Sequence, residues 1–209
     1  MADLQILEYT VGDIGTNCYL MVNTETKETI ITDPGGDAQM LQNHIRKNDL
    51  KPVAIFLTHA HYDHAHDART LKAAYQIPIY VHEAEKETLE DVRMNCSAMF
   101  GCPERYEADV FVKDGEMLSV AGFDIKVLHT PGHTPGGACY YFEKEKTLLS
   151  GDSLFCGSVG RTDFPGGSMS SLVRSLQEKI MVLPRDVEVL PGHMMRSTIG
   201  REAEYNPYL

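Results

Sequence analysis

Hydrophobic residues fall along the chain in short apolar runs, separated by polar turns and by longer stretches with helical spacing. The short runs predict strands over residues 4–9, 17–22, 29–34, 53–58, 77–82, 123–130, 136–142, 146–152 and 187–193. The helical spacing predicts helices over residues 37–49, 63–76 and 168–181. Residues 91–109 follow neither pattern. The first three strands predict an antiparallel start, and the alternation beyond them indicates an α/β (α+β) fold, with Asp37 as the N-cap of the first helix.

Four predicted strands end just before a loop that reaches histidine or aspartate. The segments are IFLTHAH, KVLHTPGH, TLLSGD and VEVLPGH, which begin at Ile55, Lys126, Thr147 and Val187. A side chain at the end of a strand has a stiff support, while the loop that follows is free to shape a cleft. We therefore expect the four loops to converge on one site.

Length and charge restrict what the chain can do. It has 209 residues and no linker-like stretch, so we expect one domain over residues 1–209. No apolar run approaches the roughly 18 residues of a membrane span, and the N-terminus lacks the features of a secretory signal, so we expect a cytoplasmic protein. A formal net charge of -11 argues against a nucleic-acid surface. A small-molecule substrate is the expected partner, and the oligomeric state stays open.

The five cysteines have scattered spacings, which is typical of reduced thiols rather than of a disulfide framework. Cys96 and Cys102 are close enough in sequence to suggest a redox or metal role. They lack the C-x-x-C spacing, however, and small apolar side chains that fill space are the commoner use of cysteine.

The densest group of polar residues is THAHYDH, from Thr58 to His64. His59 and His61 are two residues apart, so at an extended strand end they project to the same side. Asp63 and His64 follow at the start of the next helix. Imidazoles this close repel one another when protonated unless a cation binds them in the neutral form, so the spacing predicts a metal site.

Together with TPGHTPGG, LLSGDSLF and VLPGH, in this order, THAHYDH resembles the metallo-β-lactamase-fold hydrolases. The resemblance extends from GTNCYLM and TDPGGD to the end of the chain, and it implies a four-layer αβ/βα sandwich of two mixed β-sheets flanked by helices. The segment GSVGRTDFPGGS most resembles the compact bacterial type II glyoxalase-like hydrolases. These lack the C-terminal helical domain of the longer type II glyoxalases, and here the chain stops sixteen residues past His193.

The resemblance implies a centre of two divalent metal ions. The implied ligands are His59, His61 and His133 for one ion, Asp63, His64 and His193 for the other, and Asp152 for both. Imidazoles and carboxylates suit zinc, which is the metal we expect, and they also suit iron or manganese.

This ligand set implies a hydrolytic mechanism. Two ions about 3.5 to 4 Å apart hold a bridging hydroxide, because coordination lowers the pKa of water to about 7. We expect this hydroxide to attack a carbonyl, with Asp63 as a catalytic residue that binds metal and orients the nucleophile. A thiolate leaves without a strong general acid, which favours a thioester such as S-lactoylglutathione. The resemblance also favours Arg161 as the residue that binds the carboxylate of an anionic thioester, while a salt bridge to Asp163 is the structural alternative.

Other substrates stay open. Met195 stands where the longer enzymes tend to have tyrosine, which favours a more open or more apolar pocket. The segment MNCSAMF over residues 94–100 is a candidate to complete that pocket, although we expect its Met94, Met99 and Phe100 to be core residues. GRTDF also occurs in the similar persulfide dioxygenases, so a mononuclear iron oxidoreductase is the alternative to a hydrolase. Lactones or β-lactams would need the same hydroxide.

Three polar residues near the motifs are not expected to bind metal. Asp67 most simply serves the positive end of the helix that follows THAHYDH. His129 lies on the strand side of its turn, which favours packing or support of a ligand. His66 replaces the glycine that similar proteins usually have, and we expect a helix-surface histidine, with a hydrogen bond to a ligand carboxylate as the alternative.

Overall fold

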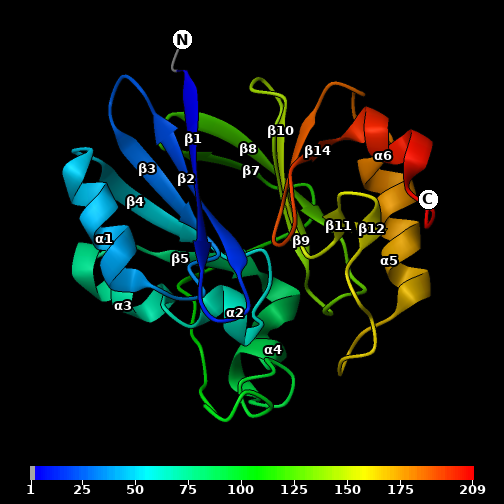
Figure 1. Ribbon diagram of the computed structural model, residues 1–209, viewed down its shortest axis with the longest axis horizontal. Coiled ribbons are helices and arrows are strands. Elements are labelled where there is room, and N and C mark those ends of the chain that lie inside the picture. Colours follow the sequence, from blue (N-terminus) through cyan, green and yellow to red (C-terminus); the bar gives the residue numbers. More distant parts are fainter. Residues whose placement is uncertain (1–2) are drawn as a thin grey trace.

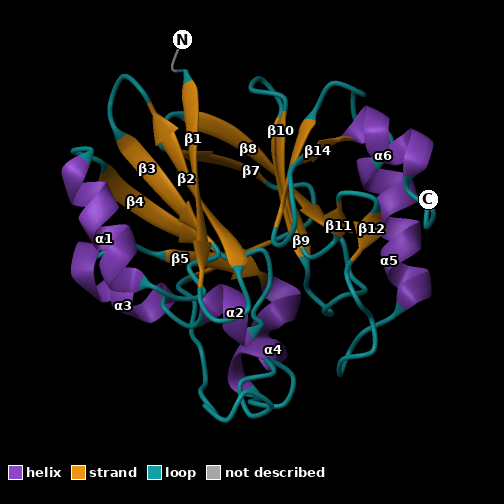
Figure 2. Cartoon of the chain, viewed as in Figure 1, coloured by secondary structure: helices purple, strands orange, loops and turns teal. Residues whose placement is uncertain are grey.

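The computed structural model describes residues 3–209 and is built around two six-stranded sheets (Figures 1 and 2). The first sheet runs in the order β1 (Leu4–Val11), β2 (Thr16–Asn23), β3 (Glu28–Thr32), β4 (Lys51–Phe56), β5 (Ile79–His82) and β6 (Val110–Val112). The second runs in the order β14 (Ser197–Thr198), β13 (Glu188–Pro191), β10 (Thr147–Gly151), β9 (Ala138–Phe142), β8 (Phe123–His129) and β7 (Met117–Val120). The strands β11 (Leu154–Phe155) and β12 (Ser158–Val159) form a separate hairpin.

Helices cover the outer face of each sheet (Figure 1). The helices of the fold are α1 (Ala38–Lys47), α2 (Tyr62–Ala65), α3 (Ala68–Tyr75), α4 (Lys86–Glu90), α5 (Met169–Ser175) and α6 (Ile199–Tyr205), with a 3₁₀ turn η1 (Glu83–Glu85) and a π-helical turn η2 (Leu176–Ile180). α1 and α3 lie against the first sheet, whereas α5 and α6 lie against the second. In the described part of the chain, no helix is both long and apolar enough to span a bilayer.

Both sheets are mixed, as predicted. β1, β2 and β3 pair antiparallel, which confirms the antiparallel start, and β3 to β6 continue in parallel. In the second sheet only β10 and β13 pair in parallel. The predicted four-layer αβ/βα sandwich is therefore confirmed. The prediction of one domain over residues 1–209 stays a prediction, and residues 1 and 2 lie outside the described residues.

Three hydrophobic cores hold the layers together. The middle core joins the inner faces of the sheets, where Phe56 and Met21 from the first sheet meet Tyr140 and Phe142 from the second. The outer cores bury the apolar faces of the helices against the two sheets. Central strands such as β2 and β9 are buried along their whole length, because layers cover both of their faces. This packing explains why these strands read as continuous apolar runs.

The helix predicted over residues 63–76 is divided into α2 and α3, with His66 and Asp67 between them. The chain turns there because Asp67 is bound to the β3–α1 loop. Its amide donates to Pro34 O at 3.0 Å, and its carboxylate accepts the amide of Ala38 at 2.8 Å. Asp67 therefore serves the positive end of α1, whereas the prediction had it serve its own helix.

Asp37 precedes α1 as predicted but does not cap it with its side chain. Its backbone is in the left-handed region, with φ at 57°. Its carboxylate accepts the amide of Gly12 at 2.9 Å. Asp67, which is distant in sequence, supplies the cap in its place.

The helix predicted over residues 168–181 ends as the π-helical turn η2, and α6 was not predicted. Glu202 holds α6 in place. Its buried carboxylate accepts hydrogen bonds from the amide of Gly157 at 2.7 Å, from Asn206 Nδ2 at 2.9 Å, and from the hydroxyl of Ser197. One buried acid thus ties the C-terminal helix to the β11–β12 hairpin.

Replacing Glu202 with alanine would leave the Gly157 amide and the Asn206 amide without their acceptor. We expect Glu202→Ala to lower the free energy of unfolding by about 2 to 4 kcal/mol, measured by denaturant titration. Glu204→Ala is the matched control, because Glu204 lies on the same helix with an exposed side chain that only pairs with Arg185 at 3.3 Å. The control should lose less than about 1 kcal/mol. Equal losses in the two variants would contradict the role assigned to Glu202.

Candidate metal centre

The four strand-end loops converge at one edge of the sandwich, as the sequence predicts. His59 and His61 follow β4, Asp63 and His64 lie on α2, His133 follows β8, Asp152 follows β10, and His193 follows β13. Their ligand atoms form overlapping groups, each with atoms within 4.8 Å of one another. The structure therefore brings together all seven residues that the sequence proposes as ligands. Their role in binding metal stays a prediction.

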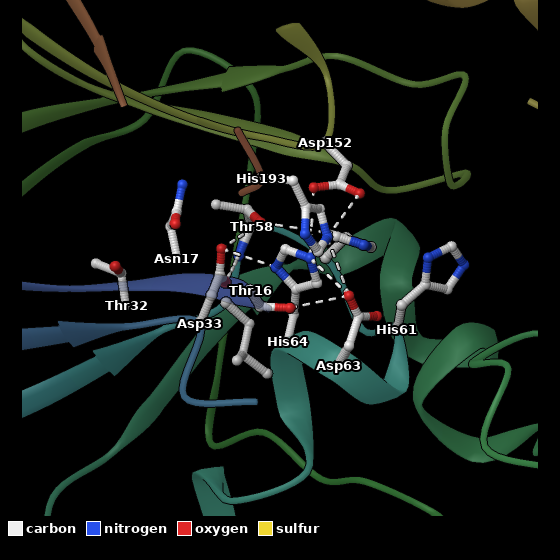
Figure 3. Close-up of polar contacts among 12 residues, drawn as sticks. Thr16, Asn17, Thr32, Asp33, Thr58, His61, Asp63, His64, Asp152 and His193 are labelled. Atoms are coloured by element: carbon white, nitrogen blue, oxygen red, sulfur yellow. Dashed lines mark hydrogen bonds and ion pairs between the residues drawn. The ribbon is translucent and has the colours of Figure 1, made fainter. Parts of the chain in front are cut away.

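Asp63, His64 and His193 form one group (Figure 3). Asp63 Oδ2 lies 3.1 Å from His193 Nε2 and 3.5 Å from His64 Nε2. The hydroxyl of Thr16 on β2 also donates to Asp63 Oδ2, at 3.0 Å. A carboxylate and two imidazoles thus point at one small volume.

His59, His61 and His133 form the second group. His61 Nδ1 and His133 Nε2 are 3.0 Å apart, and the ring of His59 lies 4.7 and 4.8 Å from the two other rings, measured between centroids. His133 Nδ1 is 2.7 Å from the backbone oxygen of Arg161, which fixes the orientation of that ring. One ring nitrogen from each of the three histidines therefore lies within 4.8 Å of those of the other two.

Asp152 lies between the two groups. Its Oδ1 is 3.4 Å from His64 Nε2, and its Oδ2 is 3.5 Å from His133 Nε2 and 3.6 Å from His193 Nε2. Asp152 also forms a possible ligand group with His59 and His64. One carboxylate therefore contacts members of both groups, as a bridging ligand would.

The donor set fits divalent cations. His59 Nε2, His61 Nε2, His64 Nε2 and Asp152 Oδ1 are buried without a hydrogen-bond partner in the part of the chain that the structure describes. Buried polar atoms without partners are costly, and a cation placed between them would satisfy several at once. Imidazole nitrogens and carboxylate oxygens are ligands of zinc, iron and manganese. The histidine and aspartate clusters are thus consistent with a dimetal site.

Burial keeps one group of imidazoles neutral. It lowers the pKa of His59 well below the ordinary value, lowers that of His61 to about 3, and also lowers that of His133. The neighbouring imidazoles lower the pKa of His59 and His61 further. A neutral imidazole is the form that binds metal, so this group is ready to do so.

The carboxylates reverse this effect in the other group. Burial alone would lower the pKa of His64, but Asp63, Asp152 and Asp33 raise it well above its ordinary value. At His193 burial also lowers the pKa, but the hydrogen bond to Asp63 and the charges of Asp152 and Asp63 together outweigh burial and raise the pKa. Conversely, His64 holds the pKa values of Asp63 and Asp152 below the ordinary range despite their burial. In this group, metal ions would take the place of protons.

Asp33 supports the centre, although no motif indicated a separate role for it. Its Oδ2 lies 3.1 Å from His64 Nδ1 and accepts the hydroxyl of Thr58 at 2.7 Å, while Oδ1 accepts the Thr58 amide at 2.8 Å. Its φ of 45° is uncommon for a residue other than glycine. Asp33 follows β3 just as the ligands follow their strands, and this position was the signal available in the sequence.

Glu85 was also missed. It is buried, and its carboxylate accepts the amide of Ala60 at 2.9 Å and the amide of Gly136 at 2.7 Å. Ala60 lies between two of the histidines, and Gly136 lies in the loop that carries His133. Glu85 therefore joins two ligand loops that are far apart in sequence. It lies on η1, outside every motif, so no sequence pattern points to it.

A cavity of about 420 Å³ opens over the centre. Cys96 and Phe100 line it, so the segment over residues 94–100 contributes to the pocket. Met99 and Phe100 are 65% and 47% exposed, so the expectation that they are core residues is wrong. Arg161 also lines the cavity, but its guanidinium is bound bidentately to Asp163, with distances of 2.8 and 2.7 Å. The structural alternative for Arg161 is therefore realised, and its contact with a substrate carboxylate stays a prediction.

The remaining polar residues take supporting positions. His129 stacks on His82, with ring centroids 3.9 Å apart, and its Nε2 lies 3.0 Å from Pro135 O. This is the packing role that was predicted. His66 Nδ1 lies 3.2 Å from a carboxylate oxygen of Glu104, so it pairs with an acid of the segment over residues 91–109 rather than with a ligand carboxylate.

Family, sequence and structure comparisons all relate the chain to metallo-β-lactamase-fold proteins. A family model described as the Metallo-beta-lactamase superfamily matches residues 11–193. The hydroxyacylglutathione hydrolase GloC of Haemophilus influenzae is 36% identical over 199 residues, which cover 92% of each chain. The structure of BLEG-1, described as a B3 metallo-beta-lactamase, is 40% identical with a TM-score of 0.93, over 98% of this chain and 99% of its own. TTHA1623, solved in a di-iron-bound form, is 34% identical with a TM-score of 0.86, over 97% and 100%.

Removing Glu85 should loosen the two loops that it joins. We expect Glu85→Ala to weaken metal binding about 10- to 100-fold, as is usual when groups that orient ligands are lost. The affinity is measured by competition with a chelator of known affinity. Glu83→Ala is the matched control, because Glu83 lies on the same short turn with an exposed side chain. Unchanged affinity in Glu85→Ala, with the fold intact, would contradict this role.

Metal binding should also release protons. The pKa of His64 is raised well above its ordinary value and that of His193 is also raised, which favours their protonated forms in the metal-free protein, and these protons must leave before a cation binds. Affinity should therefore rise with pH through and above the ordinary imidazole range. Calorimetric titration of the metal-free protein, in buffers of different ionisation enthalpy, measures the protons released. Affinity that does not change with pH would show that the two imidazoles are already neutral.

Proposed function

Because the chain belongs to the metallo-β-lactamase superfamily and has the site of a metal-dependent hydrolase, we propose that it hydrolyses a thioester. The observation that carries this proposal is the position of Asp152, which contacts members of both ligand groups beneath an open cavity. The relative GloC, whose name describes a hydrolase of hydroxyacylglutathione, supports a thioester substrate. S-lactoylglutathione is therefore the first substrate to test.

Divalent metal ions bound here, expected to be zinc with iron as the alternative, would supply a water of lowered pKa and polarise the carbonyl. The residues of the chain hold the geometry. Asp63 is fixed through Oδ2 by Thr16 and His193 and stays anionic, so it can orient a water molecule by accepting a hydrogen bond from it. Asp33 holds His64, and the Arg161 backbone holds His133. A departing thiolate does not need a general acid to protonate it. This agrees with the cavity, because its acidic lining residues, Asp63 and Asp152, are both predicted metal ligands and so are not available as proton donors.

A β-lactam is the second candidate substrate. The similarity to BLEG-1, at 40% identity over almost the full length of both chains, favours it. Opening a β-lactam requires the same attack on a carbonyl, but the leaving amine must gain a proton, for which a thiolate has no need. The two candidates therefore differ in their demand for a proton donor in the cavity.

The activity of Asp63→Asn tests the proposed role of that carboxylate. With S-lactoylglutathione we expect a loss of about 100-fold or more in kcat, because a neutral amide has no negative charge with which to orient the attacking water. Metal content must be measured in the same samples. Asp49→Asn, at an exposed position beyond the end of α1, is the control and should retain full activity. Full activity of Asp63→Asn with its metals bound would refute the assignment.

A substrate panel tests the reaction itself. Protein of known metal content is assayed with S-lactoylglutathione, other thioesters, lactones and β-lactams, and oxygen uptake is followed with glutathione persulfide. We expect thioester hydrolysis to have the highest kcat/KM. Oxygen consumption by protein with a single iron would overturn hydrolysis in favour of the persulfide dioxygenase alternative.

A further inference from the structure

We propose that the pocket over the metal centre selects thioesters with an uncharged, apolar group, and that Phe100 is the residue that determines this specificity. The inference rests on the proposed thioester hydrolysis and deepens it by naming the substrate class. Aryl and alkyl thioesters should be better substrates than anionic ones. Three observations support this specificity: the apolar lining of the cavity, the ion pair that its one arginine already makes, and the stacking of Phe100 on Tyr62.

Apolar side chains form most of the cavity wall beyond the predicted ligands. They are Ile14, Phe100, Phe155, Val159, Phe164 and Met194. Ile14, Phe100 and Met194 are 38%, 47% and 56% exposed, although large apolar side chains are usually buried. They come from three separate loops yet meet at one cavity. Exposed apolar surface gathered in this way is typical of a binding site.

The thiol of Cys96 adds to this neutral surface. Burial raises the pKa of Cys96 to about 11, so the side chain stays protonated at neutral pH. A buried neutral thiol packs like a small apolar group. The wall next to Phe100 therefore carries no charge.

Above the metal centre, the cavity wall offers no unpaired cationic side chain to an anionic substrate. Among the cavity-lining residues of the described chain, Arg161 is the only arginine or lysine. Its guanidinium is already bound bidentately to Asp163 and lies 4.1 Å from the ring centroid of Phe164. A substrate carboxylate would have to compete with Asp163 for the same donors. An uncharged group meets no such competition.

Phe100 is exposed but held in place. Its ring stacks on Tyr62, with centroids 5.5 Å apart and planes 21° apart. Tyr62 begins α2, the helix that carries Asp63 and His64, and its amide donates to Asn95 O at 2.7 Å. Phe100 is therefore positioned relative to the metal ligands by the helix that bears two of them.

His66 completes this support. Its ring lies 4.9 Å from that of Tyr62, on α2, and it pairs with Glu104. Glu104 in turn has its backbone oxygen bound by Asn95 Nδ2 at 2.9 Å. The histidine that stands where similar proteins usually have glycine thus ties α2 to the segment that presents Phe100.

Two thioesters of nearly equal size test the proposal, namely neutral S-(4-nitrophenyl) thioacetate and anionic S-(4-carboxyphenyl) thioacetate. Rates are divided by those of hydroxide-catalysed hydrolysis, to remove the difference in leaving group. We expect the metal-loaded wild type to prefer the neutral ester by about tenfold in kcat/KM, and Phe100→Ala to raise KM for it about tenfold with kcat little changed. Met99→Ala is the matched control, since Met99 is the 65% exposed neighbour and does not line the cavity. It should change neither constant.

Asp163→Asn tests the role of the ion pair separately. Releasing Arg161 should raise kcat/KM for the anionic ester more than for the neutral one. A wild type that prefers the anionic ester, or Phe100→Ala with the same constants as Met99→Ala, would overturn the inference while leaving thioester hydrolysis in place. Hydrolysis of S-lactoylglutathione but of neither aryl ester would also overturn the inference alone, whereas failure of the metal-loaded protein to hydrolyse any of the three would overturn the proposed function.

Discussion

The structure depends on holding buried imidazoles and carboxylates together in a space of a few ångströms. Three of these imidazoles, His59, His61 and His133, are kept neutral by burial, while His64 is surrounded by acids that favour its protonated form. Neither arrangement satisfies the polar atoms that face one another, since several have no hydrogen-bond partner in residues 3–209. Cations placed among them would bind the neutral imidazoles, balance the acids around His64 and give the unpaired polar atoms a partner. The centre is therefore built to bind a ligand and not only to pack the fold.

The two-sheet architecture makes this crowding possible. Each ligand loop starts from a strand buried between layers, so its first residue has little freedom. Acids outside the ligand set then fix the loops against one another, with Asp33 holding Thr58 and His64, and Glu85 joining the amides of Ala60 and Gly136. The cavity above the centre draws on a different part of the chain, because Phe100 reaches it from an irregular segment stacked on α2. A centre supported by strand ends is thus combined with a cavity wall that an irregular segment supplies.

The strands and the ligand loops were predictable because both leave local patterns, namely apolar runs and histidines at fixed spacing. Contacts between distant residues leave none. Asp67 interrupts the predicted helix because it binds Pro34 and Ala38, and Glu85 is buried because it meets amides from two loops. The pairing of Arg161 with Asp163 was foreseen as an alternative, since the two residues are neighbours in sequence. Which alternative holds depends on the conformation of the loop, which the sequence does not show.

We propose that one centre binds two metal ions through ligands from four strand ends. Anomalous diffraction at the zinc absorption edge, from crystals grown with zinc, locates the ions. We expect two peaks, each roughly 2.0 to 2.3 Å from its ligand atoms. One should lie at His59, His61 and His133, the other at Asp63, His64 and His193, with Asp152 beside both. A single peak, or a peak that leaves one of the two groups without metal, would contradict this proposal.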